Sequence, residues 1–173
     1  MTKNVITISR KYGSLGRDMG VALSEIYGIE YYDKDLIKIA SEETGVHESL
    51  FGKADEKING SFFIKRSGAY KGTVEPPTSA DYTSDKNIFS LQAEVIKRLA
   101  ERESCIIIGR CAGYVLKDFD NVCNIFLYGS EEFCVNNIAK RYALSKKEAE
   151  RLSEQVTRQR SQYYKYYTDK EWM

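Results

Sequence analysis

Hydrophobic positions along the chain fall into four short runs separated by longer amphipathic stretches. The runs cover residues 5–8, 29–32, 105–109 and 122–129, and their β-branched and aromatic residues are typical of strands. The run at 105–109, read CIIIG, is apolar throughout, which predicts a strand buried on both faces of a sheet. The pattern therefore predicts a small sheet with a covered centre.

Helical periodicity fills the stretches between these runs. Apolar residues at Met19, Ala22, Leu23 and Ile26 follow the spacing i, i+3, i+4, i+7, which predicts a helix over residues 17–27. The other expected helices show an apolar stripe or a start signal, and they cover residues 34–44, a stretch around 88–99, and the stretches that begin after Ser130 and Ser145.

Start and stop signals frame several of these helices. Gly28 and Gly45 are expected to end the first two, since glycine readily adopts the left-handed conformation of a helix C-terminus. Asp33 is expected to cap the helix at 34–44. Ser145 and Glu148 have the spacing of a capping box.

Strands and helices thus alternate along the 173 residues, which predicts one α/β domain with a parallel sheet and helices on both faces. Residues 46–85 contain both prolines and lack clear periodicity, which is typical of a long, functional or mobile loop. A sheet of this kind is expected to continue, so we expect further chain after Met173.

Composition narrows the possible functions. Lysine and arginine total 26 against 25 acidic residues, and this balance argues against a protein that binds nucleic-acid polymers. No apolar run approaches the roughly 18 residues of a membrane span.

His47 is the only histidine, which excludes multi-histidine metal sites and leaves a histidine-based catalytic triad without a nucleophile motif. The four cysteines show no CxxC pairing, so we expect free thiols and a cytoplasmic protein.

The segment 9–18, read SRKYGSLGRD, lies between the first predicted strand and the first helix. Gly13 and Gly16 allow backbone amides to point at an anion, and the start of the helix adds its partial positive charge. The usual phosphate loop ends in Gly-Lys-Ser/Thr, whereas this one ends in Gly-Arg-Asp. By spacing alone a phosphate site and a plain turn are evenly matched, and the strand–loop–helix context favours the phosphate site.

Two further arginine sites follow from the same logic. Arg110 comes directly after the buried strand, at the sheet edge where ligands of α/β proteins bind, so we favour a ligand contact over an ordinary surface residue. Arg158 and Arg160 follow a capped helix start, and arginines on a mobile helix commonly stabilise a transferring phosphoryl group. A solvated basic face with tyrosines packed beneath it is the alternative for this last stretch.

Four segments together resemble the cytidylate kinase-like proteins, which are P-loop relatives of the nucleoside monophosphate kinases. The segments read ITISRKYGSLGRDMG, YYDKDLI, CIIIGRCAGYVL and RSQYYKYYTDKEW, and the likeness runs in order from residue 5 to the end. It implies a three-layer P-loop NTPase-like fold with residues 46–85 as an acceptor-binding insertion and residues 146–167 as a lid.

The resemblance also implies a reaction and its residues. ATP would transfer a phosphoryl group to CMP or dCMP with the help of Mg²⁺, and small nucleotides would be the partners, with no nucleic-acid polymer and no membrane. The implied ATP-phosphate positions are Gly13, Ser14, Leu15, Gly16, Arg17 and Asp18; the acceptor positions are Asp33, Gly109 and Arg110; the groups on the transferring phosphate are Arg17, Arg158 and Arg160.

Several positions depart from the family pattern. Leu15 stands where the family has glycine, Cys134 and Asn137 replace basic residues, and Thr157 replaces an aspartate. Asp18 would either hold the metal or cap the helix, and we prefer the cap. In addition, ordinary cytidylate kinases read the base with an arginine where this chain has Ile39.

These departures leave three hypotheses. An active kinase of CMP-like monophosphates leads. A nucleotide-binding protein without significant kinase activity is the chief rival, and an ATP-dependent kinase of a non-nucleotide acceptor is the third. The acceptor base and sugar, the metal ligands and the oligomeric state stay open.

Overall fold

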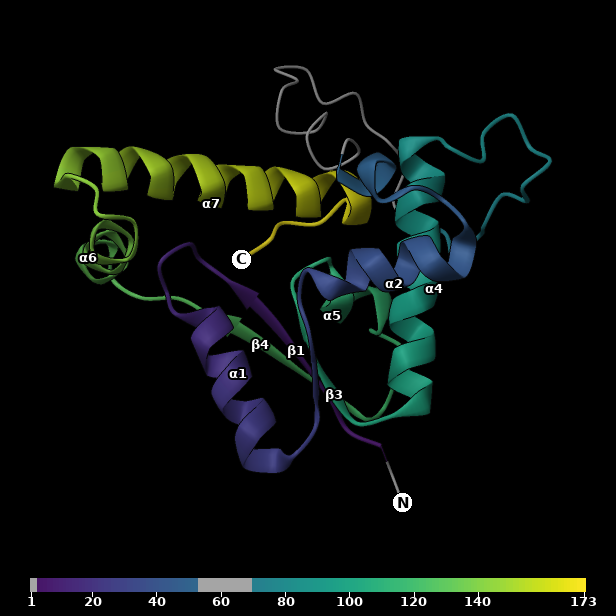
Figure 1. The fold of residues 1–173 in the computed structure, drawn as a ribbon, viewed down its shortest axis with the longest axis horizontal. Helices are drawn as coiled ribbons and strands as arrows, with labels where there is room; N and C mark the ends of the chain where they lie inside the picture. Colours follow the sequence, from purple (N-terminus) through teal and green to yellow (C-terminus); the bar gives the residue numbers. More distant parts are fainter. Residues whose placement is uncertain (1–2, 53–69) are drawn as a thin grey trace.

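The computed structural model of the chain describes residues 3–52 and 70–173 (Figure 1). Its centre is a sheet of four strands in the order β2-β3-β1-β4, and every neighbouring pair is parallel. The strands are β1 (Val5–Arg10), β2 (Glu30–Tyr32), β3 (Cys105–Ile108) and β4 (Val122–Leu127). All four coincide with the predicted apolar runs, so the predicted parallel α/β sheet is confirmed.

Helices cover both faces of this sheet, because each parallel connection must cross over it. Helix α1 lies on one side, and α4 and α5 lie on the other (Figure 1). The helices are α1 (Gly16–Tyr27), α2 (Asp35–Thr44), α4 (Asp85–Arg102), α5 (Ala112–Val115), α6 (Glu131–Tyr142) and α7 (Lys146–Thr168). Four-residue α5 was not predicted, since one turn is too short to show periodicity.

Strand β3 carries the core on both of its faces. Ile106 and Ile108 pack with Ile8 in the cluster on the α1 side, whereas Cys105 and Ile107 pack in the larger cluster on the opposite side. All four β3 side chains are buried, as the continuous apolar run predicted. This burial holds the carboxyl end of β3 in a fixed place beneath the candidate site.

Most of the predicted helix ends are present. Gly28 and Gly45 adopt left-handed conformations after α1 and α2, and Ser145 and Glu148 form the capping box of α7. The predicted cap at Asp33 is wrong, because Lys34 occupies the N-cap of α2 and makes no side-chain cap hydrogen bond. The Asp33 carboxylate instead pairs with arginines.

Residues 46–85 are described only at their two ends. Residues 48–52 are helical, and residues 70–84 form the expected irregular loop before Ser84 caps α4. The middle of the expected acceptor-binding insertion, residues 53–69, lies outside the described residues.

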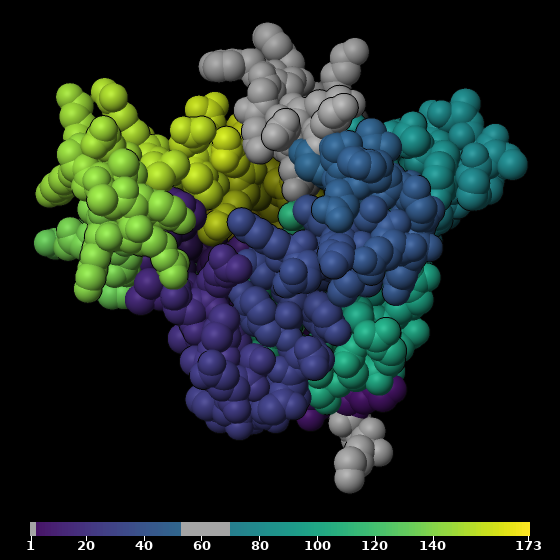
Figure 2. Space-filling model, viewed as in Figure 1, coloured from purple at the N-terminus to yellow at the C-terminus, as the bar shows by residue number. Residues whose placement is uncertain are grey.

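Helices α6 and α7 form a lobe beyond the carboxyl ends of the strands. They pack on each other through Val135, Ile138 and Ala149. Helix α7 crosses this end of the sheet in Figure 1, and in Figure 2 the α6–α7 lobe (green to yellow) lies beside the chain that follows β1 (purple). The segment expected to act as a lid, residues 146–167, is thus a single helix over the sheet edge.

All four cysteines are free thiols, as predicted. Within residues 3–52 and 70–173, no helix combines the length and apolar character that a membrane span requires.

Packing in the larger core cluster gives a first prediction. Leu36 of α2 is fully buried there, so Leu36→Ala should lower the free energy of unfolding by about 2–5 kcal/mol, through lost burial and the cavity left behind. Ile26 on α1 is 72% exposed, and Ile26→Ala should change the free energy of unfolding by less than about 0.5 kcal/mol. Urea denaturation measures both, and equal effects would contradict the described packing.

Candidate active site at the carboxyl edge of the sheet

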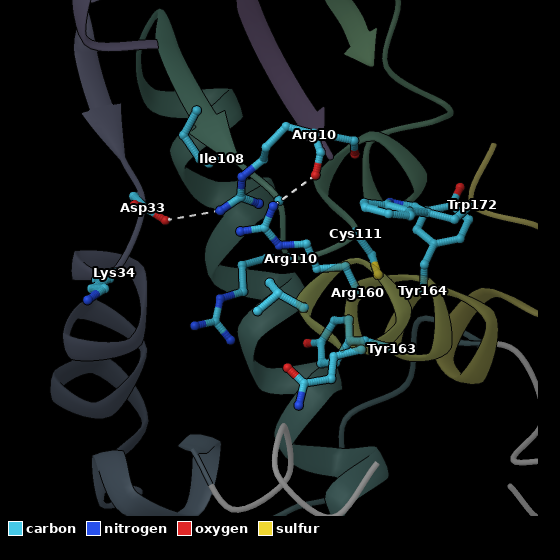
Figure 3. Close-up of a pocket in the computed structure, with 14 residues that line it drawn as sticks. Arg10, Asp33, Lys34, Ile108, Arg110, Cys111, Arg160, Tyr163, Tyr164 and Trp172 are labelled. Carbon is cyan, nitrogen blue, oxygen red and sulfur yellow. Dashed lines mark hydrogen bonds and ion pairs between the residues drawn. The ribbon is translucent and has the colours of Figure 1, made fainter. Parts of the chain in front are cut away.

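A pocket of about 310 Å³ lies where β1 and β3 end, beneath α7 (Figure 3). Four cationic side chains and one carboxylate reach it: Arg10, Arg110, Arg160, Lys34 and Asp33. The pocket therefore carries a strong excess of positive charge although the whole chain is nearly neutral. Such a local excess favours a small, multiply charged anion.

Arg10 is the most constrained of these cations. It ends β1, its side chain is only 18% exposed, and its Nη2 lies 3.7 Å from Oδ1 of Asp33. Burial lowers the pKa of Arg10, while the Asp33 charge opposes that shift. Gly109 makes room for the guanidinium, because a Cβ there would lie 2.2 Å from Nη1 of Arg10.

Arg160 reaches the same place from α7. Its Nη1 donates to the backbone carbonyl of Arg10 at 2.9 Å, and its guanidinium lies 5.2 Å from the ring centre of Tyr12. Burial, aided by the charge of Arg10, lowers the pKa of Arg160 to about 10. Two neighbouring, poorly hydrated cations are unfavourable without a counter-ion, so a bound anion would stabilise this arrangement.

Arg110 enters the pocket through an unusual turn. Gly109, Arg110 and Cys111 have φ values of 73°, 54° and 56°, so three successive residues are left-handed. Glycine tolerates this conformation, but each of the other two residues is held there at a cost of about 1–2 kcal/mol. The turn lets Arg110 line the pocket immediately after the rigid β3 strand (Figure 3).

One face of α7 forms the wall opposite the sheet. The lining residues on this helix recur at i, i+3, i+4, i+7 and i+8: Val156, Gln159, Arg160, Tyr163 and Tyr164. Arg158 falls between these positions, is exposed, and is not among the lining residues. The structure therefore separates Arg158 from Arg160, which we expected to act together.

Asp33 connects the pocket to the candidate phosphate loop. Its Oδ2 lies 3.1 Å from Nε of Arg17, in addition to its contact with Arg10. The Tyr31 hydroxyl and the Asp33 carboxylate raise the pKa of Arg17, whose side chain is about half exposed. A carboxylate shared by two arginines is engaged electrostatically, which explains why it does not cap α2.

The loop between β1 and α1 rests on α6. Gly13 has a φ of 82°, and a Cβ on it would lie 2.4 Å from the carbonyl oxygen of Cys134. Asn137 donates from Nδ2 to the carbonyl of Gly13 at 2.9 Å, and Ser14 donates from Oγ to the carbonyl of Lys11 at 2.8 Å. Of the two departures from the family pattern on this helix, the Asn137 side chain therefore supports the loop's shape, whereas position 134 contacts the loop through its backbone.

Leu15 and Asp18 lie at the start of α1, and the role of Asp18 differs from the expected one. Leu15 is the N-cap of α1 with φ 63° and ψ 20°, the region that favours glycine, and it makes no side-chain cap hydrogen bond. The preferred role of Asp18 as a helix cap is wrong, because its Oδ1 accepts from Nη2 of Arg141 on α6 at 2.7 Å. That ion pair ties α6 to the first turn of α1.

The structure thus divides the predicted site residues into groups. Asp33, Gly109, Arg110 and Arg160 line one pocket, and Arg17 joins it through Asp33. The loop positions beside the pocket but outside its lining are Gly13, Ser14, Leu15, Gly16 and Asp18.

Sequence reasoning missed part of this pocket. Arg10 ends a strand at the ligand-binding edge of the sheet, as Arg110 does, so the same argument applied to β1 would have assigned it to the pocket. The helical spacing on α7 would have selected Tyr163 and Tyr164. Nothing in the sequence pattern brings Trp172 to this pocket, since that depends on where the chain turns after α7.

A protein-only magnesium site does not fit these residues. Asp18 is paired with Arg141, and Asp33 is shared by two arginines. Across the described ranges, no group of three or more His, Cys, Asp or Glu side chains is placed to hold a metal ion. Magnesium at phosphate sites is usually bound by one or two carboxylates together with substrate phosphates and water, and the carboxylates of Asp18 and Asp33 are already engaged by arginines.

Comparison with known proteins agrees with this architecture. A model described as the cytidylate kinase-like family matches residues 5–173. The crystal structure of an uncharacterized protein from Eubacterium ventriosum is similar in fold, with a TM-score of 0.67 and 23% identity; the match covers 98% of this chain and 81% of that one. No curated protein matches the chain.

The backbone of Leu15 gives a second prediction. In an ordinary exposed loop, replacing Leu by Val should change the free energy of unfolding less than replacing it by Gly. Here Leu15→Gly should be neutral or stabilising and Leu15→Val destabilising, with unfolding free energies about 2 kcal/mol apart, since a β-branched residue tolerates positive φ worst. Chemical denaturation measures the unfolding free energies of the two variants and so gives their order of stability.

A matched substitution controls for the flexibility of glycine. Ile26 is exposed near the C-terminus of α1, and Ile26→Gly should cost about 1 kcal/mol or less. A Leu15→Gly variant less stable than Leu15→Val would contradict the left-handed backbone.

The crowded cations give a third prediction. Arg160→Met loses one hydrogen bond but relieves a buried charge beside Arg10, so the ligand-free Tm should change little, while the Tm increase caused by added pyrophosphate should disappear. Differential scanning fluorimetry measures both. Arg151→Met, exposed on the same helix, should keep the full pyrophosphate effect; an unaltered effect in Arg160→Met would remove Arg160 from the anion site.

Proposed function

The chain belongs to the cytidylate kinase-like family, and from this membership and the arginine-lined pocket we propose that it transfers a phosphoryl group from ATP to a nucleoside monophosphate, CMP or dCMP first among them. The observation that carries the proposal is the convergence of Arg10, Arg110 and Arg160 beside a glycine-containing strand–loop–helix unit. Both features lie at the carboxyl edge of a parallel sheet, where such ligands bind.

The fold proposed for this function is that of the P-loop NTPases. A loop of five residues, Lys11–Leu15, joins β1 to α1, and β1 is an inner strand of the sheet. The N-terminus of α1 therefore points its amides and partial positive charge toward the pocket side of the sheet. This arrangement supports an ATP-phosphate site at residues 13–18.

Donor and acceptor would occupy neighbouring places. The loop and Arg17 would hold the β- and γ-phosphates of ATP, and the pocket cations Arg10 and Arg110 would hold the phosphate of the acceptor. Asp33 now neutralises Arg10 and Arg17 together, so binding of phosphates to these arginines would replace that contact. Replacement of one anion by another keeps the cations paired throughout.

Transfer itself would depend on position and charge. An acceptor phosphate oxygen attacks the γ-phosphorus in line with the leaving ADP oxygen, and no covalent intermediate with the protein is required. Arg160 lies between the loop and the pocket through its contacts with Tyr12 and Arg10, a position suited to the equatorial oxygens of the transferring group. Helix α7 would act as the lid that excludes water.

Magnesium would enter with ATP as a complex with its phosphates. It would supply charge neutralisation on the phosphoryl oxygens, and the arginines described above would supply the protein's share.

Two alternatives rest on specific observations. The strained, non-glycine backbone at Leu15 favours a nucleotide-binding protein without useful turnover. The pocket also suits a phosphorylated acceptor other than a nucleotide, because its cations recognise phosphate rather than base. A coupled ADP-release assay over CMP, dCMP, UMP and AMP separates these possibilities, and ATP binding without turnover of any monophosphate would contradict the proposed kinase.

The proposed division of roles gives a fourth prediction. Arg17→Ala and Arg110→Ala should each lower kcat/KM by about 100-fold or more, because each removes a charged contact to a phosphate that is made in the substrate complex and kept in the transition state. Arg17→Ala should chiefly raise the KM for ATP, and Arg110→Ala the KM for the monophosphate. Arg151→Ala, an exposed charge on α7, serves as the matched control and should leave both constants unchanged.

A further inference from the structure

The pocket has two chemically different ends. Its cations gather around Arg10 and Asp33, whereas Tyr164 and Trp172 line the opposite end, which Cys111 also borders (Figure 3). We propose that Trp172 and Tyr164 form a ring-binding subsite, which holds the planar ring of the phosphorylated acceptor while the arginines hold its phosphate. The inference rests on the proposed function for its choice of acceptor over donor.

Both aromatic side chains are held in place from behind. Trp172 packs edge-to-face on Phe126 of β4, with ring centres 5.1 Å apart and planes at 78°. Tyr164 packs on Tyr114 of α5 in the same manner, at 6.5 Å and 78°. Rings fixed by such contacts lose little conformational freedom when a ligand stacks on them. Ordering of these side chains therefore reduces the binding free energy only slightly.

The electrostatics at this end suit a neutral ring. The Tyr164 hydroxyl is neutral at neutral pH, as in any ordinary tyrosine, and burial raises its pKa further. Within the pocket lining, Lys34, Asp33 and the arginines supply the charged groups, and Cys111, Tyr164 and Trp172 supply a neutral region. A ligand with a phosphate at one end and an uncharged planar ring at the other matches both regions.

The size of the pocket favours one such ligand. A volume of about 310 Å³ is at the lower end of the range for small-molecule sites and fits a single monophosphate. The loop residues 13–18 do not line this pocket, so the donor phosphates would lie beside it rather than in it. The ring at Trp172 is therefore assigned to the acceptor and not to the adenine of ATP.

This subsite also offers a way to bind the acceptor base in a chain that has Ile39 in place of a base-reading arginine. Ile39 packs against the hydrophobic core, so it offers the acceptor base no polar contact. Stacking on Trp172 and Tyr164 recognises a planar ring without reading its hydrogen-bond pattern. We accordingly expect these two rings to favour ring-bearing monophosphates over ring-free ones without themselves selecting among the bases.

The single tryptophan of the chain allows a direct test. Trp172 fluorescence should be quenched by CMP and by UMP, and not by ribose 5-phosphate, which carries the same phosphate and sugar without a ring. ATP alone should leave the signal unchanged. Quenching by ATP and not by any monophosphate would overturn the assignment to the acceptor, and the absence of quenching by any ring-bearing monophosphate would overturn the subsite.

Variants measured by calorimetry complete the test. Trp172→Ala should weaken CMP binding by roughly 5- to 100-fold, while the affinity for ribose 5-phosphate stays the same, and Trp172→Phe should retain most of the affinity for CMP. Tyr27→Ala removes an exposed aromatic ring at the other end of the sheet and should change neither affinity. The Phe variant and a thermal unfolding scan detect a loss of folding.

The outcomes separate this inference from the proposed kinase activity. Phosphoryl transfer to CMP with undiminished CMP affinity in Trp172→Ala would overturn the subsite and leave the kinase in place. Ring-dependent binding and quenching without any transfer would support the subsite and overturn the kinase.

Discussion

Three guanidinium groups brought together at the end of a parallel sheet are the constraint on which the rest of this structure depends. The Arg10 side chain is partly buried at the end of β1, Arg160 donates a hydrogen bond to the Arg10 backbone carbonyl, and Arg110 follows the adjacent strand. Their mutual repulsion and loss of hydration would be unfavourable in a protein with no anion to bind. Asp33 supplies a compensating charge through its contacts with Arg10 and Arg17, which makes that carboxylate the natural competitor of a phosphate.

Backbone strain is concentrated around the same edge. Leu15 and the turn at 109–111 hold non-glycine residues in left-handed conformations within the two loops that flank the pocket. Such strain persists only where surrounding packing enforces it, here the buried β3 strand and the contacts from α6. Proteins commonly give up stability at binding sites in this way, so the strain is consistent with a ligand site at this edge.

The elements of the fold could be predicted because their signals are local. Alternation of short apolar runs and amphipathic stretches identified all four strands and the long helices, and the buried run at β3 marked the centre of the sheet. The roles of Asp33 and Asp18 could not be predicted in the same way. Each lies where an acidic helix cap is common, yet each pairs with an arginine, and the partner of Asp18 lies 123 residues further along the chain.

By itself, the sequence determined the parallel α/β architecture, the placing of Arg110 and the glycine loop at the carboxyl edge, and membership of the family. Periodicity and strand ends carry that information within a few neighbouring residues. Only the tertiary structure decided that Arg158 lies outside the lining of the pocket and that Trp172 returns to its aromatic end. Those outcomes depend on how α7 crosses the sheet and where the chain turns afterwards, which long-range packing alone specifies.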